Sequence, residues 1–442
     1  MKIAIIGGGL AGLTAAAYLS ENRELEGTVF ERSPQLGGRA FTYQKSGFTL
    51  NYGAHAVYGI DRHTLHHLEE DLGLVFESKQ VDKRKVVYAK NDHLTPAPLD
   101  FMNIMKTDVL SSMEKVRFVA EIAAIIGHVH HLKNYDTLGD YLDHSHASDD
   151  VKELWKHLVC SNFFITPSDA RKVSGEVIAE YYHNLFLSSK PVNYILGSWA
   201  AITDQLQDKI DHNEKWNIAL KEPVESIAQE NGKFLLRTKN HEALVFDKVI
   251  IATPVQQAVK LLENTEWSVH LDPYKDNTPT EVMVYDIGFK EVVARPFHYI
   301  SDMTNKMFIS DVSATDYTVV PEGGQLLQGI AYLNDDFKDD EERKAYLEKK
   351  TNSMESLFDK YYPGWREAVE VKRVSKKAMV SSVKNISTNR LLPNRLPDVP
   401  FFFCGDGCVG KGELAERAFS SGRKVALKLL SQMIKPEKVA SE

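Results

Sequence analysis

The chain has few cysteines. Among its 442 residues there are three, Cys160, Cys404 and Cys408. This number is too small for a disulfide framework and indicates a reducing compartment, so we expect a cytoplasmic protein. Cys404 and Cys408 form a C-x₃-C pair, but no second ligand pair with zinc-site spacing accompanies them. We therefore expect no metal site.

The chain also lacks a long basic run and a long apolar run. Its formal net charge of −8 argues against nonspecific binding of nucleic acid. The apolar residues 118–129 (FVAEIAAIIGHV) contain Glu121 and are too short to cross a bilayer. The apolar start IAIIGGG is too short for a secretory signal. An alternative for residues 111–129 is an amphipathic helix that makes peripheral contact with a membrane.

The first 32 residues predict one βαβ unit. Residues 2–6 (KIAII) have the pattern of a buried strand, and residues 27–32 (GTVFER) have that of a second strand. Between them, residues 10–22 are rich in Ala and Leu and predict a helix. Residues 61–200 change to helical apolar spacing.

Strand patterns return after this helical region. They cover residues 217–253 and 280–335 and are followed by a charged helix over 339–362. One more buried strand, over 399–406, precedes a closing helix over 413–434. The last residues, IKPEKVASE, are expected to form a frayed tail.

Because both ends of the chain carry strand–glycine–helix patterns, we predict one α/β domain assembled from distant segments. We assign residues 1–60, 210–265 and 395–435 to this Rossmann-like nucleotide-binding domain. Residues 61–209 and 266–394 then form a mixed α+β substrate-binding domain that includes a helical insertion.

The glycine-rich start of the chain predicts a dinucleotide site. Gly7, Gly9 and Gly12 make G-x-G-x-x-G directly between a strand and a helix. The first glycine permits a tight turn, the second lets the backbone approach a pyrophosphate, and the third lets helix and strand pack closely. Leu10 and Ala11 lie at the helix N-terminus, where free N–H groups favour negative charge. This motif alone serves NAD, NADP or FAD.

The residues at the end of the second strand help to distinguish among these three cofactors. Glu31 is placed to accept hydrogen bonds from ribose hydroxyls and would repel the 2′-phosphate of NADP; we include its neighbour Arg32 in the site. Gly37 and Gly38 follow at a turn and let the main chain contact a bulky ligand. Arg39 is suited to bind phosphate oxygens in a bidentate manner.

With these residues, the sequence resembles the flavin amine oxidase superfamily. The stretches GGGLAGLTAAAYL and VFERSPQLGGRAFT match its FAD-binding start, and FTLNYGAHAVYG matches the segment that usually follows. The resemblance implies FAD as cofactor and adds Gly53, Ala54 and His55 to its site. The family commonly has Asp where this chain has Asn51.

Two later segments carry the same resemblance. In EPVESIAQ, Val224 stands where the family contacts adenine through its backbone, and FDKVIIATP supplies Ala252. The closing flavin motif matches FFFCGDGCVGKGELAERAFSSG. It implies roles at the cofactor for five residues near the C-terminus: Gly405, Asp406, Glu413, Leu414 and Ala415.

The resemblance also implies a reaction. Members of the superfamily oxidise C–C or C–N bonds, with the flavin as hydride acceptor. The helical region carries aromatic-rich faces that form either a helix core or a channel for an apolar small molecule; they comprise Phe163, Phe164, Tyr181, Tyr182, Leu185 and Phe186. These faces favour a desaturase-like or protoporphyrinogen-oxidase-like enzyme acting on an apolar or polycyclic substrate.

Other functions stay open. A flavin amine oxidase is the first alternative, and Lys306 is its candidate active-site lysine, although a solvated turn explains that residue as well. A flavin-dependent isomerase and a non-catalytic carrier of prenylated proteins are alternatives of another class. Because LGGRA and FCGDG are present, a flavin-free carrier is disfavoured. We assign no catalytic residue and no oligomeric state.

Overall fold

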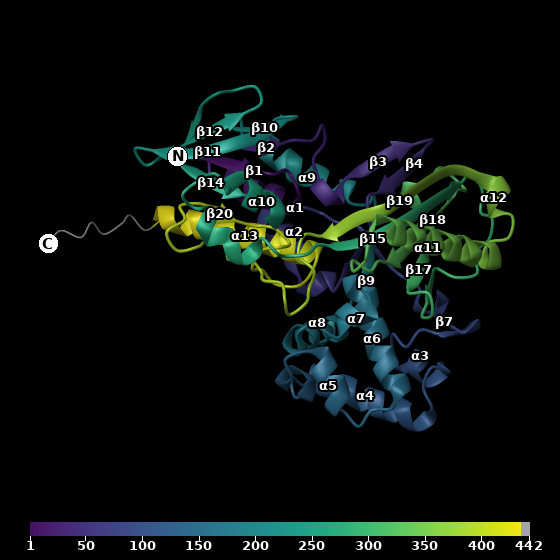
Figure 1. The fold of residues 1–442 in the computed structure, drawn as a ribbon. Helices are drawn as coiled ribbons and strands as arrows, with labels where there is room; N and C mark the ends of the chain where they lie inside the picture. The colour runs from purple at the N-terminus through teal and green to yellow at the C-terminus, as the bar shows by residue number, and fades with distance from the viewer. Residues whose placement is uncertain (435–442) are drawn as a thin grey trace.

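The computed structural model describes residues 1–434, so the predicted tail lies almost entirely outside the described part. The molecule has three parts: a nucleotide-binding unit and a central β-sheet lie side by side, and a lobe of helices lies below them in the view of Figure 1. Both the first and the last described elements belong to the nucleotide-binding unit. The mixed α/β class predicted from the sequence is confirmed.

The nucleotide-binding unit is built on a parallel sheet with strand order β10-β2-β1-β14-β20. Every neighbouring pair in it is parallel. Its strands come from three distant parts of the chain, as the two glycine-bearing ends predict: β1 (Lys2–Ile6), β2 (Glu26–Glu31), β10 (Trp216–Leu220), β14 (Lys248–Ile251) and β20 (Phe402–Phe403).

Helices cover this sheet. The first is α1 (Leu10–Ser20), an Ala- and Leu-rich helix that is buried on all sides and packs along α13 (Ala415–Ile434). A small antiparallel sheet and α10 (Val255–Leu262) belong to a second core of the same unit. That small sheet contains β11 (Val224–Glu230), β12 (Lys233–Thr238) and β13 (Leu244–Phe246).

Two helices from the predicted substrate side pack into the nucleotide-binding unit. They are α2 (Thr64–Leu72), which contacts α13, and α9 (Ala200–Asp211), which contacts α1. Their buried residues Leu68 and Leu206 share one core with α1. The boundary that we drew between residues 209 and 210 therefore runs through α9, because apolar spacing alone does not say which sheet a helix covers.

The central sheet has seven strands in the order β19-β15-β18-β17-β16-β7-β8. They are antiparallel except for the pair β16–β7, and α11 (Asp340–Tyr361) packs on β18. The strands are β19 (Val369–Ser381), β15 (Thr280–Phe289), β18 (Gln325–Tyr332), β17 (Met307–Asp311), β16 (Tyr299–Asp302), β7 (Val86–Lys90) and β8 (His93–Pro96).

The strands β7 and β8 come from the region for which we predicted helical spacing. Both are short, and a run of basic residues precedes them, so their pattern is weak in the sequence. Two small sheets join the parts: β3 (Thr42–Lys45) with β4 (Phe48–Asn51), and β5 (Ala56–Tyr58) with β9 (Val192–Ile195) and β6 (Ser78–Gln80).

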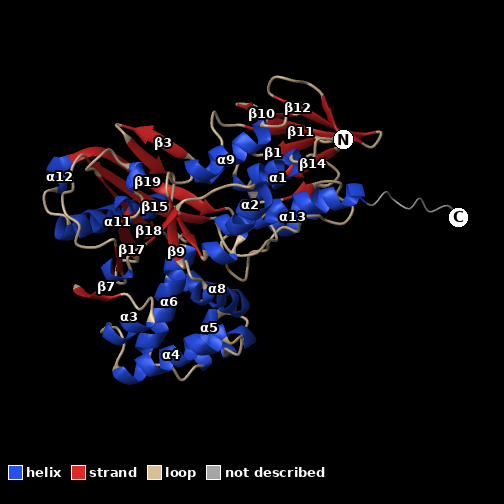
Figure 2. Ribbon diagram, turned by 180° about the vertical axis from the view of Figure 1, so that it is seen from behind, coloured by secondary structure: helices blue, strands red, loops and turns tan. Residues whose placement is uncertain are grey.

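The helical lobe forms the far end of the molecule when it is seen from either side (Figures 1 and 2). It contains α3 (Phe101–Lys106), α4 (Ser112–Ile126), α5 (Leu138–His144), α6 (Asp149–Phe163), α7 (Pro167–Ala170) and α8 (Gly175–Leu187). Capping boxes begin α4 at Ser111 and α5 at Thr137. In residues 1–434 we find no helix with both the length and the apolar character that a membrane crossing requires.

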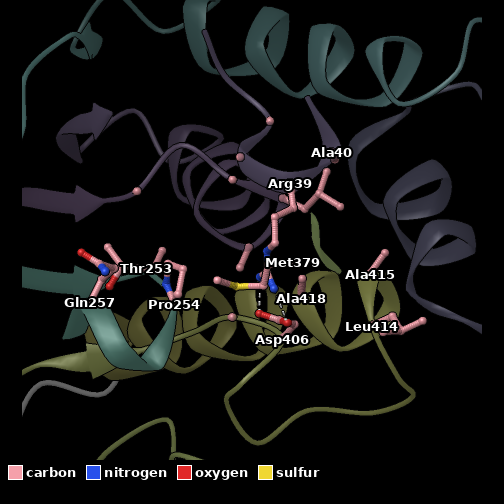
Figure 3. Close-up of a pocket in the computed structure, with 18 of the residues that line it drawn as sticks. Arg39, Ala40, Thr253, Pro254, Gln257, Met379, Asp406, Leu414, Ala415 and Ala418 are labelled. Carbon is pink, nitrogen blue, oxygen red and sulfur yellow. Dashed lines mark hydrogen bonds and ion pairs between the residues drawn. The ribbon is translucent and has the colours of Figure 1, made fainter. Parts of the chain in front are cut away.

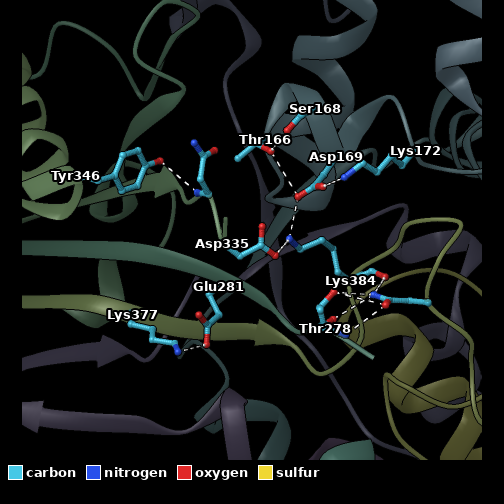
Figure 4. A network of polar contacts seen from close by, with 12 residues as sticks. Thr166, Ser168, Asp169, Lys172, Thr278, Glu281, Asp335, Tyr346, Lys377 and Lys384 are labelled. Carbon is cyan, nitrogen blue, oxygen red and sulfur yellow. Dashed lines mark hydrogen bonds and ion pairs between the residues drawn. The ribbon is translucent and has the colours of Figure 1, made fainter. Parts of the chain in front are cut away.

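A buried ion network ties the lobe to the rest of the molecule (Figure 4). Lys384, which follows β19, donates to Asp169 of α7 at 2.8 Å and also to Asp335, which follows β18. Its side chain is only 5% exposed, so the Lys384 ammonium group depends on these two carboxylates for charge compensation. Lys172 donates to the other oxygen of Asp169 at 3.1 Å.

Candidate functional site

A cavity of about 890 Å³ lies at the carboxyl ends of β1, β2 and β14. This edge of a parallel sheet is where nucleotides bind in open α/β folds. Eighteen of the twenty predicted site residues line it, and Figure 3 labels four of these, Arg39, Asp406, Leu414 and Ala415. The eighteen are Gly7, Gly9, Leu10, Ala11, Glu31, Arg32, Gly37, Gly38, Arg39, Gly53, Ala54, Val224, Ala252, Gly405, Asp406, Glu413, Leu414 and Ala415.

The three glycines of the first loop have different surroundings. Gly7 has a φ of +113°, which favours glycine. A Cβ on Gly12 would lie 2.0 Å from the carbonyl oxygen of Gly7, so Gly12 serves close packing between helix and strand rather than the cavity wall. A Cβ on Gly9 would meet no protein atom closer than 3.9 Å. The space beside Gly9 is therefore open toward the cavity, as a pyrophosphate site requires.

Glu31 ends β2 at the cavity wall and is 8% exposed. One carboxylate oxygen accepts the Gly8 N–H at 2.8 Å, and the other accepts the Ser33 N–H at 2.8 Å. These bonds hold the side chain in one orientation. Since each carboxylate oxygen has two acceptor positions, capacity remains for ribose hydroxyls.

The second glycine loop is joined to the first. The Gly37 N–H donates to the Gly8 carbonyl at 2.8 Å, and both Gly37 and Gly38 have positive φ values, +101° and +58°. The left-handed backbone and the lack of side chains let this loop approach Gly9 closely. The glycine pair thus forms part of the same cradle as the dinucleotide motif.

Arg39 reaches across the cavity to Asp406 (Figure 3). Its Nη1 donates to one carboxylate oxygen at 2.7 Å, and its Nη2 donates to the other. The sequence predicted both residues at the cofactor, but not that they form a bidentate ion pair with each other. With its side chain 30% exposed, Arg39 keeps donor groups on the cavity side.

Asp406 is held by further donors. It accepts the Ser382 N–H at 2.7 Å and the hydroxyls of Ser381 and Ser382 at 2.9 and 2.8 Å. Burial alone would raise the pKa of Asp406, but the charge and hydrogen bonds of Arg39, together with Ser382, hold it well below its usual range. The carboxylate therefore stays charged and positions Arg39.

The two ends of the cavity differ in their lining. One end is bounded by Val224 at the start of β11 and by Thr253, Pro254 and Gln257 at α10. The opposite end is bounded by Leu414 and Ala415 at the start of α13 (Figure 3). Leu414 has a φ of +54°, an uncommon conformation for a branched side chain that marks a constrained position.

Two carboxyl groups lie beside Leu414. Glu413 forms an ion pair with Arg417, and Glu416 accepts the Thr64 N–H at 3.0 Å and the Thr64 hydroxyl. Burial raises the pKa of Glu416 to about 8, although the bonds from Thr64 act in the opposite direction. Glu416 was not predicted as a residue of the cavity wall, because nothing in the sequence around Thr64 indicates that these two residues are hydrogen-bond partners.

His55 is the second predicted residue that does not line the cavity. Its ring packs edge-on against Tyr194 at 4.7 Å, and its Nδ1 lies 3.1 Å from the side-chain amide of Asn51. Burial lowers the pKa of His55 to about 3, so the ring is neutral. The backbone on both sides, at Ala54 and Ala56, does line the cavity.

The aromatic faces of the helical region divide into two groups. Of the six predicted residues, Phe164 and Tyr181 line the cavity, and the other four (Phe163, Tyr182, Leu185 and Phe186) belong to the core of the lobe. Tyr58 and Trp199 join the first group. The Tyr181 hydroxyl is buried without a hydrogen-bond partner. Phe164 and Tyr181 thus belong to both the core and the cavity wall, and the other four residues belong to the core alone.

The remaining reactive residues lie elsewhere. Cys404 and Cys408 are buried free thiols outside the cavity wall, and burial raises the pKa of Cys404 to about 12. Lys306 lies in the β16–β17 turn with a φ of +56° and does not line the cavity. Across the described residues, no group of three His, Cys, Asp or Glu side chains has the geometry of a metal site.

Comparison with known proteins gives the family. The model of the flavin containing amine oxidoreductases matches residues 10–430. The flavin-containing amine oxidase A of dog is 24% identical over 277 residues, which are 59% of this chain and 50% of that protein. A 4,4′-diapophytoene desaturase of Staphylococcus haemolyticus is 43% identical over 53 residues, 12% of this chain and 10% of the desaturase. The chain thus spans half or less of the length of these relatives.

The fold also has solved counterparts. The structure of an oxidoreductase from Methanosarcina mazei superposes with a TM-score of 0.78 at 19% identity, covering 98% of this chain and 100% of the other. At this identity the likeness establishes the fold over the whole chain.

Proposed function

The chain belongs to the flavin containing amine oxidoreductase family, whose members are FAD-dependent oxidoreductases, and we propose that this member removes hydride from a C–C or C–N bond of an apolar or polycyclic small molecule. The observation that carries the proposal is the unequal lining of one continuous cavity. Glycine and backbone groups form its nucleotide side, and aromatic side chains from the helical region form the other.

The residues fit FAD along the cavity. The open space at Gly9 suits the pyrophosphate, and Glu31 suits the adenosine ribose. The adenine would lie beside Val224, at one end of the cavity. At the opposite end, the N–H groups of Leu414 and Ala415, at the start of α13, would face the flavin. When bound there, FAD accepts the hydride that leaves the substrate.

The aromatic end supports an apolar substrate. Tyr58, Phe164, Tyr181 and Trp199 line it. The pKa of Tyr181 is raised well above its usual value by burial, so its hydroxyl is neutral. Glu413 is paired with Arg417, and the pKa of about 8 keeps much of Glu416 protonated at neutral pH. This wall therefore offers hydrophobic contact and neutral hydroxyls rather than a free charge.

An amine oxidase is the second candidate, and one observation favours it. The rings of Tyr58 and Tyr181 lie 6.5 Å apart in the cavity wall, at 56° to each other. Such a pair could flank an amine. Against it, the one lysine that lines the cavity in residues 1–434 is Lys260, which lies on α10 at the adenine side.

The test mixes the FAD-loaded protein, without oxygen, with each member of a panel of polyenes, porphyrinogens and amines. Reduction of the flavin is measured as the loss of oxidised-flavin absorbance. We expect bleaching by a polyene or a porphyrinogen. Bleaching by primary amines alone would replace the proposal by the amine oxidase. A substrate that is converted only after the flavin has been reduced, with no net consumption of electrons, would indicate an isomerase.

We also propose a small-molecule substrate without a nucleic-acid partner and a reducing, cytoplasmic location. The net charge of −8 supports the first point, and the buried, unpaired state of Cys160, Cys404 and Cys408 supports the second.

A further inference from the structure

The outward side of α3 is apolar. Phe101, Met102 and Met105 are 61%, 60% and 48% exposed, whereas Asn103 and Ile104 face the interior. On a helix, positions 101, 102 and 105 fall on one side. Three of the four exposed side chains of this six-residue helix are therefore large and apolar, and the fourth is Lys106.

The beginning of α4 continues this surface. Met113 and Val116 are 78% and 64% exposed and lie one turn apart on α4. The Lys115 ammonium donates to the Met105 carbonyl at 3.0 Å, which holds the start of α4 against the end of α3. We call this surface the α3–α4 patch; it consists of Phe101, Met102, Met105, Met113 and Val116. Contiguous exposed apolar surface of this kind marks an interaction site.

Basic residues border the α3–α4 patch. Lys106 ends α3, and Lys83 and Lys85 lie in the 3₁₀ turn before β7, which is held beside α3 by a 3.2 Å hydrogen bond from the Asn103 amide to the Lys83 carbonyl. None of these three lysines has an ion-pair partner among the described residues.

The neighbouring acidic groups already have partners within the protein. Asp82 pairs with Arg84 at 2.9 Å, and Asp108 lies 3.3 Å from His93. Asp100 caps α3, and Glu114 belongs to the capping box of α4. Around the α3–α4 patch, five basic residues face four acidic ones, so the border carries a formal excess of one positive charge in a chain whose net charge is −8; the basic residues are Lys83, Arg84, Lys85, Lys106 and Lys115.

We propose that the α3–α4 patch docks the protein onto the surface of an anionic lipid bilayer. Phe101, Met102 and Met105 would enter the boundary between headgroups and acyl chains, and the bordering lysines would contact anionic headgroups. Charge complementarity favours this occupant over a second copy of the chain, because two copies would bring the same lysines together.

The position in the fold agrees with this role. The helices α3 and α4 form the end of the lobe that lies farthest from the nucleotide-binding unit (Figures 1 and 2). The same lobe supplies Phe164 and Tyr181 to the aromatic end of the cavity. The proposal does not depend on the substrate, because it concerns a surface outside the cavity.

The structure also changes the expectation for residues 111–129. The helix α4 covers Ser112–Ile126 and buries Phe118 and Ile125 in the core of the lobe. The large apolar side chains that α4 exposes, Met113 and Val116, lie in its first turns, and α3 was not singled out from the sequence.

The test is co-sedimentation of the full-length, FAD-loaded protein with two kinds of vesicle: phosphatidylcholine alone, and equal parts of phosphatidylcholine and phosphatidylglycerol. We expect binding to the anionic vesicles and a loss of about tenfold or more in the triple variant Phe101→Ser, Met102→Ser, Met105→Ser. Replacing Lys83, Lys85 and Lys106 by Gln should weaken binding by about fivefold for each lysine, at low salt.

A matched control is the double variant Val75→Ser, Val269→Ser, which removes side chains that are 75% and 61% exposed elsewhere on the molecule. It should bind like the unmodified protein. The proposal is overturned if the unmodified protein ignores anionic vesicles, or if the triple variant and the control bind equally. A concentration-dependent dimer that is lost in the triple variant, without vesicle binding, would assign the patch to self-association. Flavin content is measured in every variant, so a failure of the cofactor assignment is seen separately.

Discussion

The two ends of the cavity are lined by different chemical groups. At the nucleotide end, the wall consists of glycines and backbone groups on loops that follow β1 and β2. At the other end, it consists of aromatic side chains such as Phe164, Tyr181 and Trp199, which come from or next to helices. Backbone geometry recognises a cofactor that many proteins share, whereas side chains can change without disturbing the fold.

Identity to known proteins is higher over a short segment than over the whole chain. The desaturase of Staphylococcus haemolyticus is 43% identical over 53 residues, whereas the full-length structural match to the Methanosarcina mazei oxidoreductase has 19% identity. The predictions below test whether the two ends can be altered separately.

The largest effects are expected at two glycines of one motif, and replacing them should have different consequences. Gly9→Val should leave the fold intact and abolish FAD binding, since its φ of −81° suits valine and no protein atom lies within 3.9 Å of the added Cβ. Gly12→Ala should destabilise the fold itself, because the new Cβ would lie 2.0 Å from the Gly7 carbonyl oxygen. Thermal unfolding and flavin content, measured on both variants, check this. A Gly9→Val protein that retains FAD would refute the placement of the pyrophosphate.

The next effect concerns the contact between the helical lobe and the rest of the molecule. Lys384→Met leaves the buried Asp169 with Lys172 as its remaining cation and should lower the free energy of unfolding by about 1–3 kcal/mol, because buried hydrogen bonds to a charged group are lost. Lys377→Met is the control, because its partner Glu281 lies at 3.1 Å in a pair whose lysine is 49% exposed (Figure 4); it should cost at most about 1 kcal/mol. Equal losses in denaturant unfolding would mean that the buried network does not hold the lobe.

Another effect should be confined to the cofactor end. Glu31→Ala should weaken FAD binding by about 1–3 kcal/mol, because a buried hydrogen-bonded carboxylate is lost. Glu31→Gln keeps one acceptor oxygen and should lose less. Titration of the apoprotein with FAD measures both. Unchanged affinity in Glu31→Ala would make Glu31 a support for the Gly8 loop and nothing more.

A further effect lies at the aromatic end and depends on pH. The pKa of Glu416 is raised from 4.5 to about 8, so its contribution to stability is fully present below about pH 4.5 and is lost as the pH rises through about 8. We expect the free energy of unfolding to fall over this interval, and this fall to be absent in Glu416→Gln. The measurement is the free energy of unfolding of both proteins across that range. A pH dependence that persists in the variant would have to come from other groups.

Much of the nucleotide end could be predicted because its residues act through local backbone geometry. Gly7, Gly9 and Gly12 lie within one turn and one helix start, and their spacing alone indicates a dinucleotide site. The pair of Arg39 and Asp406 joins positions 367 residues apart. Each residue was predicted at the cofactor, but spacing along the chain carries no information on such a contact.

The helical region was predicted less completely, for a physical reason. Apolar spacing indicates which side of a helix is buried but not against what, so α2 and α9 were assigned to the substrate side although they cover α1 and α13. It also does not identify an apolar side that remains exposed, such as that of α3. The short strands β7 and β8 reach the central sheet only through long-range pairing.

The most direct test of the account is the visible absorption spectrum of the purified protein, followed by extraction and titration of its cofactor. We predict oxidised-flavin absorbance from FAD bound in the cavity, present in the unmodified protein and missing in Gly9→Val at equal stability. A protein that is colourless, and that remains without flavin absorbance after incubation with FAD and removal of the excess, would contradict the account.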